Sequence, residues 1–160
     1  MSHAATNEEW GHTINIAGLQ RTLSQVMSKE FVLVSLGIDS DANKAKLQET
    51  MQNFNTTLHA LVSGDPDRGI VGAPNQQVLD SLQDVIDLWS PFEELLRQNV
   101  DSVRFSDGSA NRPVLEAVSA QNVKLLAASG VVVSGLVDAA KVAGASTNGL
   151  VQDIAGRQRS

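Results

Sequence analysis

The chain has 160 residues, a formal net charge of −6, no cysteine and few aromatic residues, which are four Phe and two Trp. This length suits one domain with a substantial core, and the acidic balance argues against nucleic acid, which needs a clustered basic surface. The lack of cysteine excludes thiol catalysis, disulfides and thiolate metal sites. A core of Leu, Val, Ala and Ile favours an all-α fold of helices packed on helices.

The first predicted helix covers residues 6–36, with Thr6 as its N-cap and Gly37 ending it. At about 100° per residue, one apolar stripe predicts the core-facing side: Ile16, Leu19, Leu23, Val26, Met27 and Val34. The opposite stripe is small and polar, with one permanent cation: Ile14, Ala17, Gly18, Arg21, Gln25 and Ser28. Because one buried face is enough to fold a helix, the second patterned face predicts a second partner.

A second helix is predicted over residues 41–62, with the Asp-Ser-Asp run at 39–41 as its cap. Its apolar residues recur at helical spacing, and we expect these to face the core: Leu47, Met51, Phe54, Leu58 and Leu61. A loop rich in Gly, Asp and Pro follows, up to Pro74.

A third helix is predicted over residues 75–103. Pro91 lies inside it and predicts a kink near Trp89, because the proline ring removes a backbone hydrogen bond and clashes with the preceding turn. The residues expected to face the core are Val78, Leu82, Val85, Ile86, Trp89, Leu95 and Leu96.

Pro113 suits the first turn of a fourth helix that extends to Val142. Its expected core residues are Leu115, Val118, Val123, Leu126, Val133, Leu136 and Val137. Short connections between long helices predict an antiparallel four-helix bundle. No membrane span is predicted, since the longest apolar run, residues 125–137, is shorter than the roughly 20 residues a bilayer requires.

Residues 153–160 repeat residues 15–22 in register, with Asp for Asn15 and Ser for Thr22. Repetition at domain-length spacing is typical of tandem arrays. We therefore expect a bundle domain over residues 1–143 and a flexible tail over 144–160 that holds the start of a second copy, all within a larger parent protein.

These motifs resemble a known family. The Asn-x-Ala-Gly-x-x-Arg core at 15–21, continued as Leu-Ser-Gln-x-Met at 23–27, resembles the first helix of PilJ-type sensor domains, the N-terminal domains of type IV pili methyl-accepting chemotaxis transducers. It is also similar to the P-box of nitrate/nitrite sensor histidine kinases. Leu-Trp-Ser-Pro-Phe at 88–92 resembles the third-helix signature of PilJ-type domains, and Asn122 with Leu125 and Leu126 is similar to their fourth helix.

The resemblance implies a periplasmic (extracytoplasmic) sensor module of a bacterial signal-transduction protein. It implies a parallel homodimer through the first helix that binds a small inorganic anion, nitrate or nitrite, where the two first helices meet. The anion-contacting Arg corresponds to Arg21 and the glycine one turn earlier to Gly18, while Asn15 and Ala17 match the rest of the box.

Two positions of the box depart from the family's pattern. Leu19 stands where the pattern often has Arg, and Thr22 stands where Met is usual. Arg157 restores the first of these in the repeat. Anion sensing is therefore a firmer expectation than nitrate itself.

The residues also supply a physical reason for such a site. Ala17 and Gly18 have almost no side chain, so two copies of the helix can approach closely. Two-fold symmetry would bring two Arg21 guanidinium groups together, and these repel unless an anion lies between them. Gln25 and Asn15 could add neutral donors or brace the arginine.

Two alternatives stay open at this stage. The bundle could be a structural interaction module whose outer first-helix face binds a protein and no small ligand. It could also be a histidine-phosphotransfer domain that uses His59. No catalytic constellation, cofactor motif or metal-ligand spacing occurs among the residues, His3, His12 and His59 included, so we predict neither an enzyme nor a metal site. A membrane would be engaged only by other parts of the parent protein.

Overall fold

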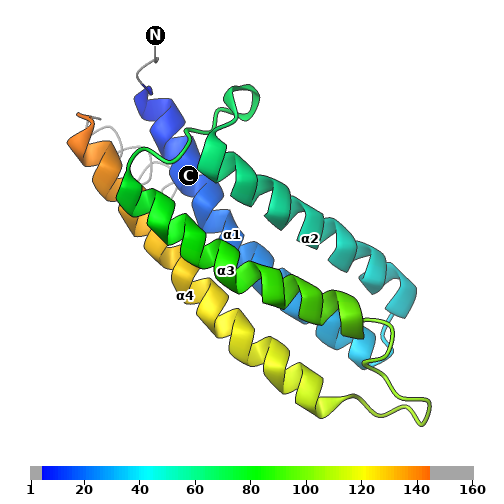
Figure 1. The fold of residues 1–160 in the computed structure, drawn as a ribbon. Helices are drawn as coiled ribbons and strands as arrows, with labels where there is room; N and C mark the ends of the chain where they lie inside the picture. Colours follow the sequence, from blue (N-terminus) through cyan, green and yellow to red (C-terminus); the bar gives the residue numbers. More distant parts are fainter. Residues whose placement is uncertain (1–4, 145–160) are drawn as a thin grey trace, which may run out of the picture.

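The computed structural model describes residues 5–144 and contains four long helices (Figure 1). They are α1 (Asn7–Ser35), α2 (Ser40–Ser63), α3 (Gln76–Asn99) and α4 (Arg112–Val142), with a short 3-10 turn η1 (Pro66–Arg68) between α2 and α3. Successive helices run in opposite directions, so the predicted antiparallel four-helix bundle is confirmed. The predicted repeat at 153–160 lies outside the described residues.

Local signals at the helix ends explain why the predicted boundaries hold. Thr6 forms a capping box with Glu9, in which the Thr6 hydroxyl accepts from the Glu9 backbone N–H and the Glu9 carboxylate accepts from the Thr6 N–H. Asn75 and Asn111 cap α3 and α4 in a similar way through their side-chain oxygens. The third helix ends at Asn99, four residues before the predicted end, and residues 100–111 form the connection to α4.

Gly37 ends α1 for two reasons. Its φ of +73° lies in the left-handed region that favours glycine, and the guanidinium end of Arg104, a flexible side chain, lies 2.7 Å from where a Cβ would be and would have to move aside for any other residue. Arg104 comes from the α3–α4 connection and its Nη1 donates to the Ser35 carbonyl at 3.5 Å. A cation therefore lies against the C-terminal end of α1, where the helix dipole favours it.

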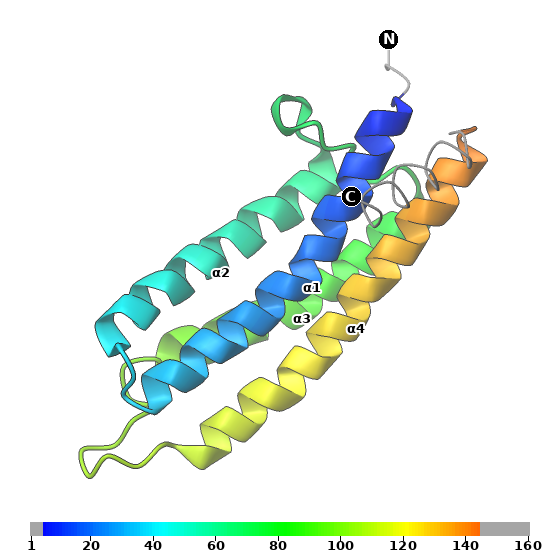
Figure 2. The ribbon, with the colours of Figure 1, turned by 180° about the vertical axis from the view of Figure 1, so that it is seen from behind.

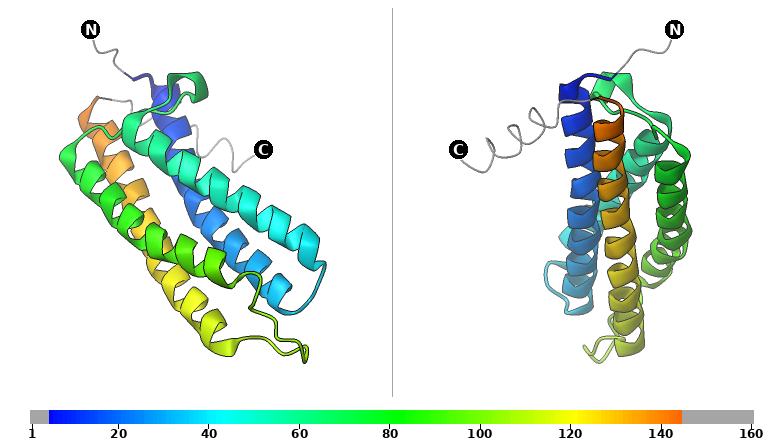
Figure 3. Two further views of the ribbon diagram at one scale, coloured as in Figure 1. Left: turned by 45° about the vertical axis from the view of Figure 1, so that its right-hand side comes forward. Right: turned by 90° about the vertical axis from the view of Figure 1, so that its left-hand side faces the viewer.

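The four helices are not equally close to one another. α1 packs against both α2 and α4, and α3 packs against α4, whereas α2 and α3 share few contacts. Figure 2 and the right-hand view of Figure 3 show α1 and α4 side by side, with the start of α1 and the end of α4 at the same end of the bundle. α1 thus has neighbours on two sides and one open side.

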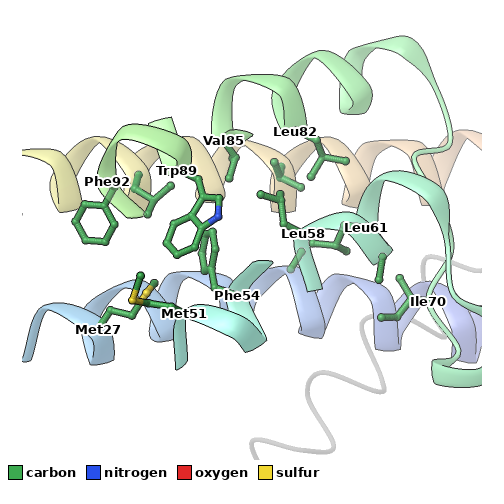
Figure 4. Packing of buried hydrophobic residues seen from close by; sticks show 14 of the residues in the cluster. Met27, Met51, Phe54, Leu58, Leu61, Ile70, Leu82, Val85, Trp89 and Phe92 are labelled. Atoms are coloured by element: carbon green, nitrogen blue, oxygen red, sulfur yellow. The ribbon is translucent and has the colours of Figure 1, made fainter. Parts of the chain in front are cut away.

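Aromatic residues of α2 and α3 anchor the middle of the core. The rings of Phe54 and Trp89 lie 4.4 Å apart between centroids, and Phe92 follows at 6.2 Å from Trp89 (Figure 4). The Trp89 indole N–H donates to the side-chain oxygen of Asn55 at 3.2 Å, so its polar atom is satisfied. The motif at 88–92 therefore serves the core. α3 continues through Pro91, and the predicted kink stays a prediction.

The residues predicted to face the core of α2 are all buried, but two other predictions are wrong. Val123 of α4 is 64% exposed. On α1, Leu19 is 52% exposed, whereas Ile14 and Ala17, which were expected on the outer side, are buried in the core. The reason is that α1 is wedged between α2 and α4, and its buried side includes small and polar residues that a hydrophobic pattern does not mark: Gly11, Thr13, Gln20 and Ser24.

By length and composition alone, α4 is long and apolar enough to cross a membrane. The sequence predicted no span because only the uninterrupted apolar run at 125–137 was considered. A helix that packs in the core of a bundle passes the same test, since it must also be rich in apolar residues. The finding is therefore weak evidence for a membrane span.

Candidate functional site

The predicted site is partly assembled on the open side of α1. Arg21, Gly18 and Gln25 line one hollow of about 310 Å³ between α1 and α4. The other residues that line it are Thr22, Leu126 and Val133. This side of the bundle faces the reader in Figure 2. The spacing predicted this grouping on α1, because residues 18, 21 and 25 are three to four apart and share one side of a helix.

Arg21 is the one charged residue of this hollow. Its side chain is exposed and lies along α4, since a Cβ added at Gly130 would be 3.9 Å from the Arg21 Nε. Within residues 5–144 no acidic side chain lies within ion-pair distance of the Arg21 guanidinium, and none of its N–H groups makes a hydrogen bond. A guanidinium presents five N–H donors in a planar fork that suits carboxylate, phosphate and other oxyanions.

Gly18 lies one turn before Arg21 with open space beside it. A Cβ built on Gly18 meets no atom within 4 Å, so packing inside the domain does not require glycine here. Glycine inside a helix costs about 1 kcal/mol relative to alanine. Packing among the described residues therefore gives no reason for a glycine at position 18.

Two predicted site residues do not line the hollow. Ala17 is 1% exposed and faces the core, so any contribution it makes to a ligand on the outer side is indirect. Asn15 is half-buried and is not among the lining residues. Leu19 lies in a different groove, between α1 and α2, that also contains Arg68.

Gln20 is a residue of the motif whose place the sequence analysis missed. It is 2% exposed, and its Nε2 donates to the Phe54 carbonyl of α2 at 3.1 Å, so it connects two helices inside the bundle. A signal for it was present in the sequence, since the repeat retains a Gln at 158. The motif at 15–21 therefore has an outer part, Gly18 and Arg21, and an inner part, Ala17 and Gln20.

A larger groove of about 390 Å³ opens between α2 and α3. Its two basic residues are already paired: Lys44 Nζ lies 3.3 Å from Asp101, and Arg97 Nη2 lies 3.4 Å from Glu93. Hydrophobic residues such as Leu47, Met51 and Leu96 lie beneath them and belong mainly to the core.

Other chemistry finds little support in the part of the chain that the structure describes. No group of three or more His, Cys, Asp or Glu residues is placed to hold a metal ion there. His59 lies exposed on α2, and His12 lies exposed on α1.

Comparison with known proteins identifies the family. The model of the N-terminal domain of type IV pili methyl-accepting chemotaxis transducers, the PilJ family, matches residues 4–122, which include α1 to α3 and the first third of α4. The chain is a PilJ-family domain. None of the curated proteins compared with it gives a significant match.

A solved structure supports the same conclusion for this PilJ-family domain. The ligand-binding domain of the P. aeruginosa nitrate receptor McpN superposes with a TM-score of 0.63 and 27% sequence identity, over 77% of this chain and 91% of that chain. The fold and the family together make the domain a sensor module of the chemoreceptor kind.

Proposed function

We propose that this PilJ-family domain senses a small inorganic anion, with nitrate or nitrite first among candidates, bound by Arg21 where the α1 helices of two copies meet. The observation that carries the proposal is the exposed Arg21 guanidinium, which has no partner within the described residues and lies in a hollow on the open side of α1. The nitrate receptor with a similar domain supports the choice of ligand.

Symmetry explains why an anion would act as a switch. When two copies pair through α1, each contributes one Arg21, and two like charges at close range oppose the pairing. A planar oxyanion offers oxygens to both guanidinium forks and removes the repulsion. Gly18 permits the close approach because it has no side chain, and Gln25 lies one turn beyond Arg21 with an amide that can donate to the same anion.

The arrangement of α1 and α4 suggests how binding would be transmitted. The start of α1 and the end of α4 lie at the same end of the bundle, so a shift between the two helices changes the relative positions of both ends of the four-helix bundle (Figure 3). A ligand moves such an equilibrium only by the difference in its affinity for the two arrangements. We place the module outside the cytoplasm, in keeping with its chemoreceptor family.

The test is thermal unfolding of the purified domain in a panel of sodium salts at equal ionic strength: nitrate, nitrite, chloride, sulfate and phosphate. At 100 times the Kd, a ligand adds about 2.7 kcal/mol to stability, which is roughly 5–10 °C in Tm for a domain of this size. We expect nitrate or nitrite to raise Tm and to raise the dimer fraction measured by sedimentation velocity.

Two arginine variants separate specific binding from salt effects. Arg21→Ala should abolish the shift, whereas Arg97→Ala, which removes an exposed arginine paired with Glu93, should retain it in full. If no anion of the panel shifts Tm, or if both variants respond like the wild type, the proposed site is wrong.

A protein partner in place of the anion is the second candidate. The exposed apolar side chains of Leu19 on α1 and of Val123 and Val131 on α4 favour it, since they leave hydrophobic surface in contact with water. A protein partner becomes the favoured candidate if none of the anions changes the Tm of the domain.

A further inference from the structure

A small internal cavity lies between all four helices at the level of Gln20. Each helix contributes two residues to its lining: Ala17, Gln20, Leu58, Leu61, Leu82, Val85, Ser129 and Val132. Four of the apolar wall residues, from α2 and α3, are labelled in Figure 4. The free volume is about 10 Å³, close to the roughly 10–15 Å³ that one water molecule needs by the same measure.

Two polar side chains line this otherwise apolar cavity, and each has one atom without a hydrogen-bond partner among the described residues. Gln20 and Ser129 are both 2% exposed. The Gln20 Nε2 is satisfied by the Phe54 carbonyl, but its Oε1 accepts no hydrogen bond, and the Ser129 Oγ makes none either. A buried polar atom without a partner costs about 1–3 kcal/mol, and native proteins seldom leave one unsatisfied.

We propose that this cavity is the binding site of one structural water molecule, held between the Gln20 Oε1 of α1 and the Ser129 Oγ of α4. The water donates one hydrogen bond to Gln20 Oε1. It forms a second hydrogen bond with the Ser129 hydroxyl, either as donor or as acceptor. Because Gln20 Nε2 already connects α1 to α2, the water completes a polar link across three helices. No charged side chain lines the cavity, so a neutral ligand suits it and an ion does not.

The water site is independent of the proposed anion site. Gln20 faces the core whereas Arg21 lies on the outer side of α1, so either proposal can fail without the other. The free volume of about 10 Å³ suits a ligand of the size of one water molecule better than a larger polar ligand.

Direct detection uses the wild-type domain in buffer without oxyanions. A crystal structure at high resolution should show one water within about 3.2 Å of both Gln20 Oε1 and Ser129 Oγ. In solution, nuclear Overhauser spectra should show cross-peaks between a long-lived water and the Gln20 side-chain amide. An empty cavity, or a direct bond between Gln20 and Ser129, would overturn the proposal.

Variants test whether the two side chains act through the water. Ser129→Ala should abolish the cross-peaks to the Gln20 side-chain amide, and Ser129→Ala and Gln20→Leu should each lower Tm by roughly 3 °C or more. Because either substitution alone already removes the water, the two losses of stability should not add. The double variant should be no less stable than the less stable of the two single variants. Losses that add in the double variant would contradict a shared water.

Ser81→Ala is the matched control. Ser81 is a buried serine of α3 whose hydroxyl donates to the Gln77 carbonyl, and it does not line this cavity, so the variant should retain the water cross-peaks. Arg21→Ala should retain them as well. Loss of the cross-peaks in either control would mean that they report general loosening of the bundle, and the assignment of the water to Gln20 and Ser129 would fail.

Discussion

One hollow of the bundle lies between α1 and α4 and another lies between α2 and α3. Helices α2 and α3 lie toward the reader in Figure 1, and α1 and α4 lie toward the reader in Figure 2. The α2–α3 groove is the larger, at about 390 Å³ against about 310 Å³. Its cations, Lys44 and Arg97, are paired with neighbouring carboxylates. Among residues 5–144, the α1–α4 hollow instead contains Arg21 without a partner and Gly18 without a neighbour that would meet an added Cβ.

The contrast teaches that size is a poor guide to the site in this domain. The α2–α3 groove arises because those two helices share few contacts, and the charges at its rim already satisfy one another. In the α1–α4 hollow, neither the charge of Arg21 nor the helix glycine at position 18 is explained by contacts with other residues of the range 5–144. An unpaired charge and an unexplained helix glycine therefore indicate a ligand or a second copy more clearly than the volume of a groove does.

The largest effect is expected for Trp89→Ala, next to the α2–α3 groove. Removing the indole deletes the ring contact with Phe54 and leaves the Asn55 side-chain oxygen without its donor, so stability should fall by about 3–5 kcal/mol. Urea denaturation measures it. Trp89→Phe, which keeps a ring but not the N–H, should cost clearly less. A loss below about 1 kcal/mol for Trp89→Ala would show that the residues next to the α2–α3 groove do not serve mainly to stabilise the fold.

Gly18→Ala should separate stability from function on the other side. Because an added Cβ meets no atom, alanine should stabilise the isolated domain by about 0.5–1 kcal/mol while it weakens anion-dependent pairing. Urea denaturation without anion and sedimentation velocity with nitrate measure the two effects. The control is Gly135→Ala in the core, where the new Cβ would lie 3.2 Å from the Val78 Cγ2, so that Val78 must shift and the gain in stability should be smaller than for Gly18→Ala. Unchanged pairing in Gly18→Ala would remove the reason given for this glycine.

Glu30 tests whether a charged group without a full set of partners always marks a ligand site. It is buried on α1 with one carboxylate oxygen unpaired, and its burial raises the pKa of this carboxyl group above 4.5. The folded state then holds its proton to higher pH than the unfolded state, so Glu30 lowers stability as pH rises from about 4.5 through the raised pKa.

Glu30→Gln should therefore stabilise the domain at neutral pH and flatten the fall in stability over that pH range, without changing the response to anions. Denaturation at a series of pH values from 4 to 7, on the order of half a unit apart, follows the slope. If the free energy of unfolding depends on pH in the same way for the wild type and the variant, the folded state does not raise the pKa of Glu30 and the interpretation is wrong.

The smallest effect is expected for Lys44→Ala at the rim of the α2–α3 groove. Its partner Asp101 is 84% exposed at its side chain, so water screens the pair, and its loss should cost less than about 1 kcal/mol. The Tm shift with nitrate should equal that of the wild type. A lost shift would move the anion site to this groove and reverse the comparison.

Most of the fold follows from local features of the chain. Thr6, Asn75 and Asn111 supply side-chain caps, and Gly37 ends α1, so helix boundaries are set within a few residues of sequence. The end of α3 at Asn99 was harder to predict, because Val103 is buried in the following loop and extends the apolar pattern beyond the helix.

The candidate site was predicted in part, for a reason that lies in α1 itself. Helical spacing alone groups Gly18, Arg21 and Gln25, whichever way the helix faces. The same spacing misplaced Ala17, because hydrophobicity marked Leu19 as a core residue when it is exposed.

The sequence by itself determined the four helices, their order and the family motif on the first of them, because caps, glycines and periodicity act over a few residues. Only the tertiary structure decided which side of α1 is buried, since that depends on how α2 and α4 both pack against it. Small and polar residues such as Thr13, Gln20 and Ser24 fit between the two neighbours. The Gln20 amide donates to the Phe54 carbonyl of α2, whereas the Ser24 hydroxyl donates to the Arg21 carbonyl of α1 itself. That choice of face leaves Arg21 beside α4, on the open side, and places Gln20 at the centre of the bundle.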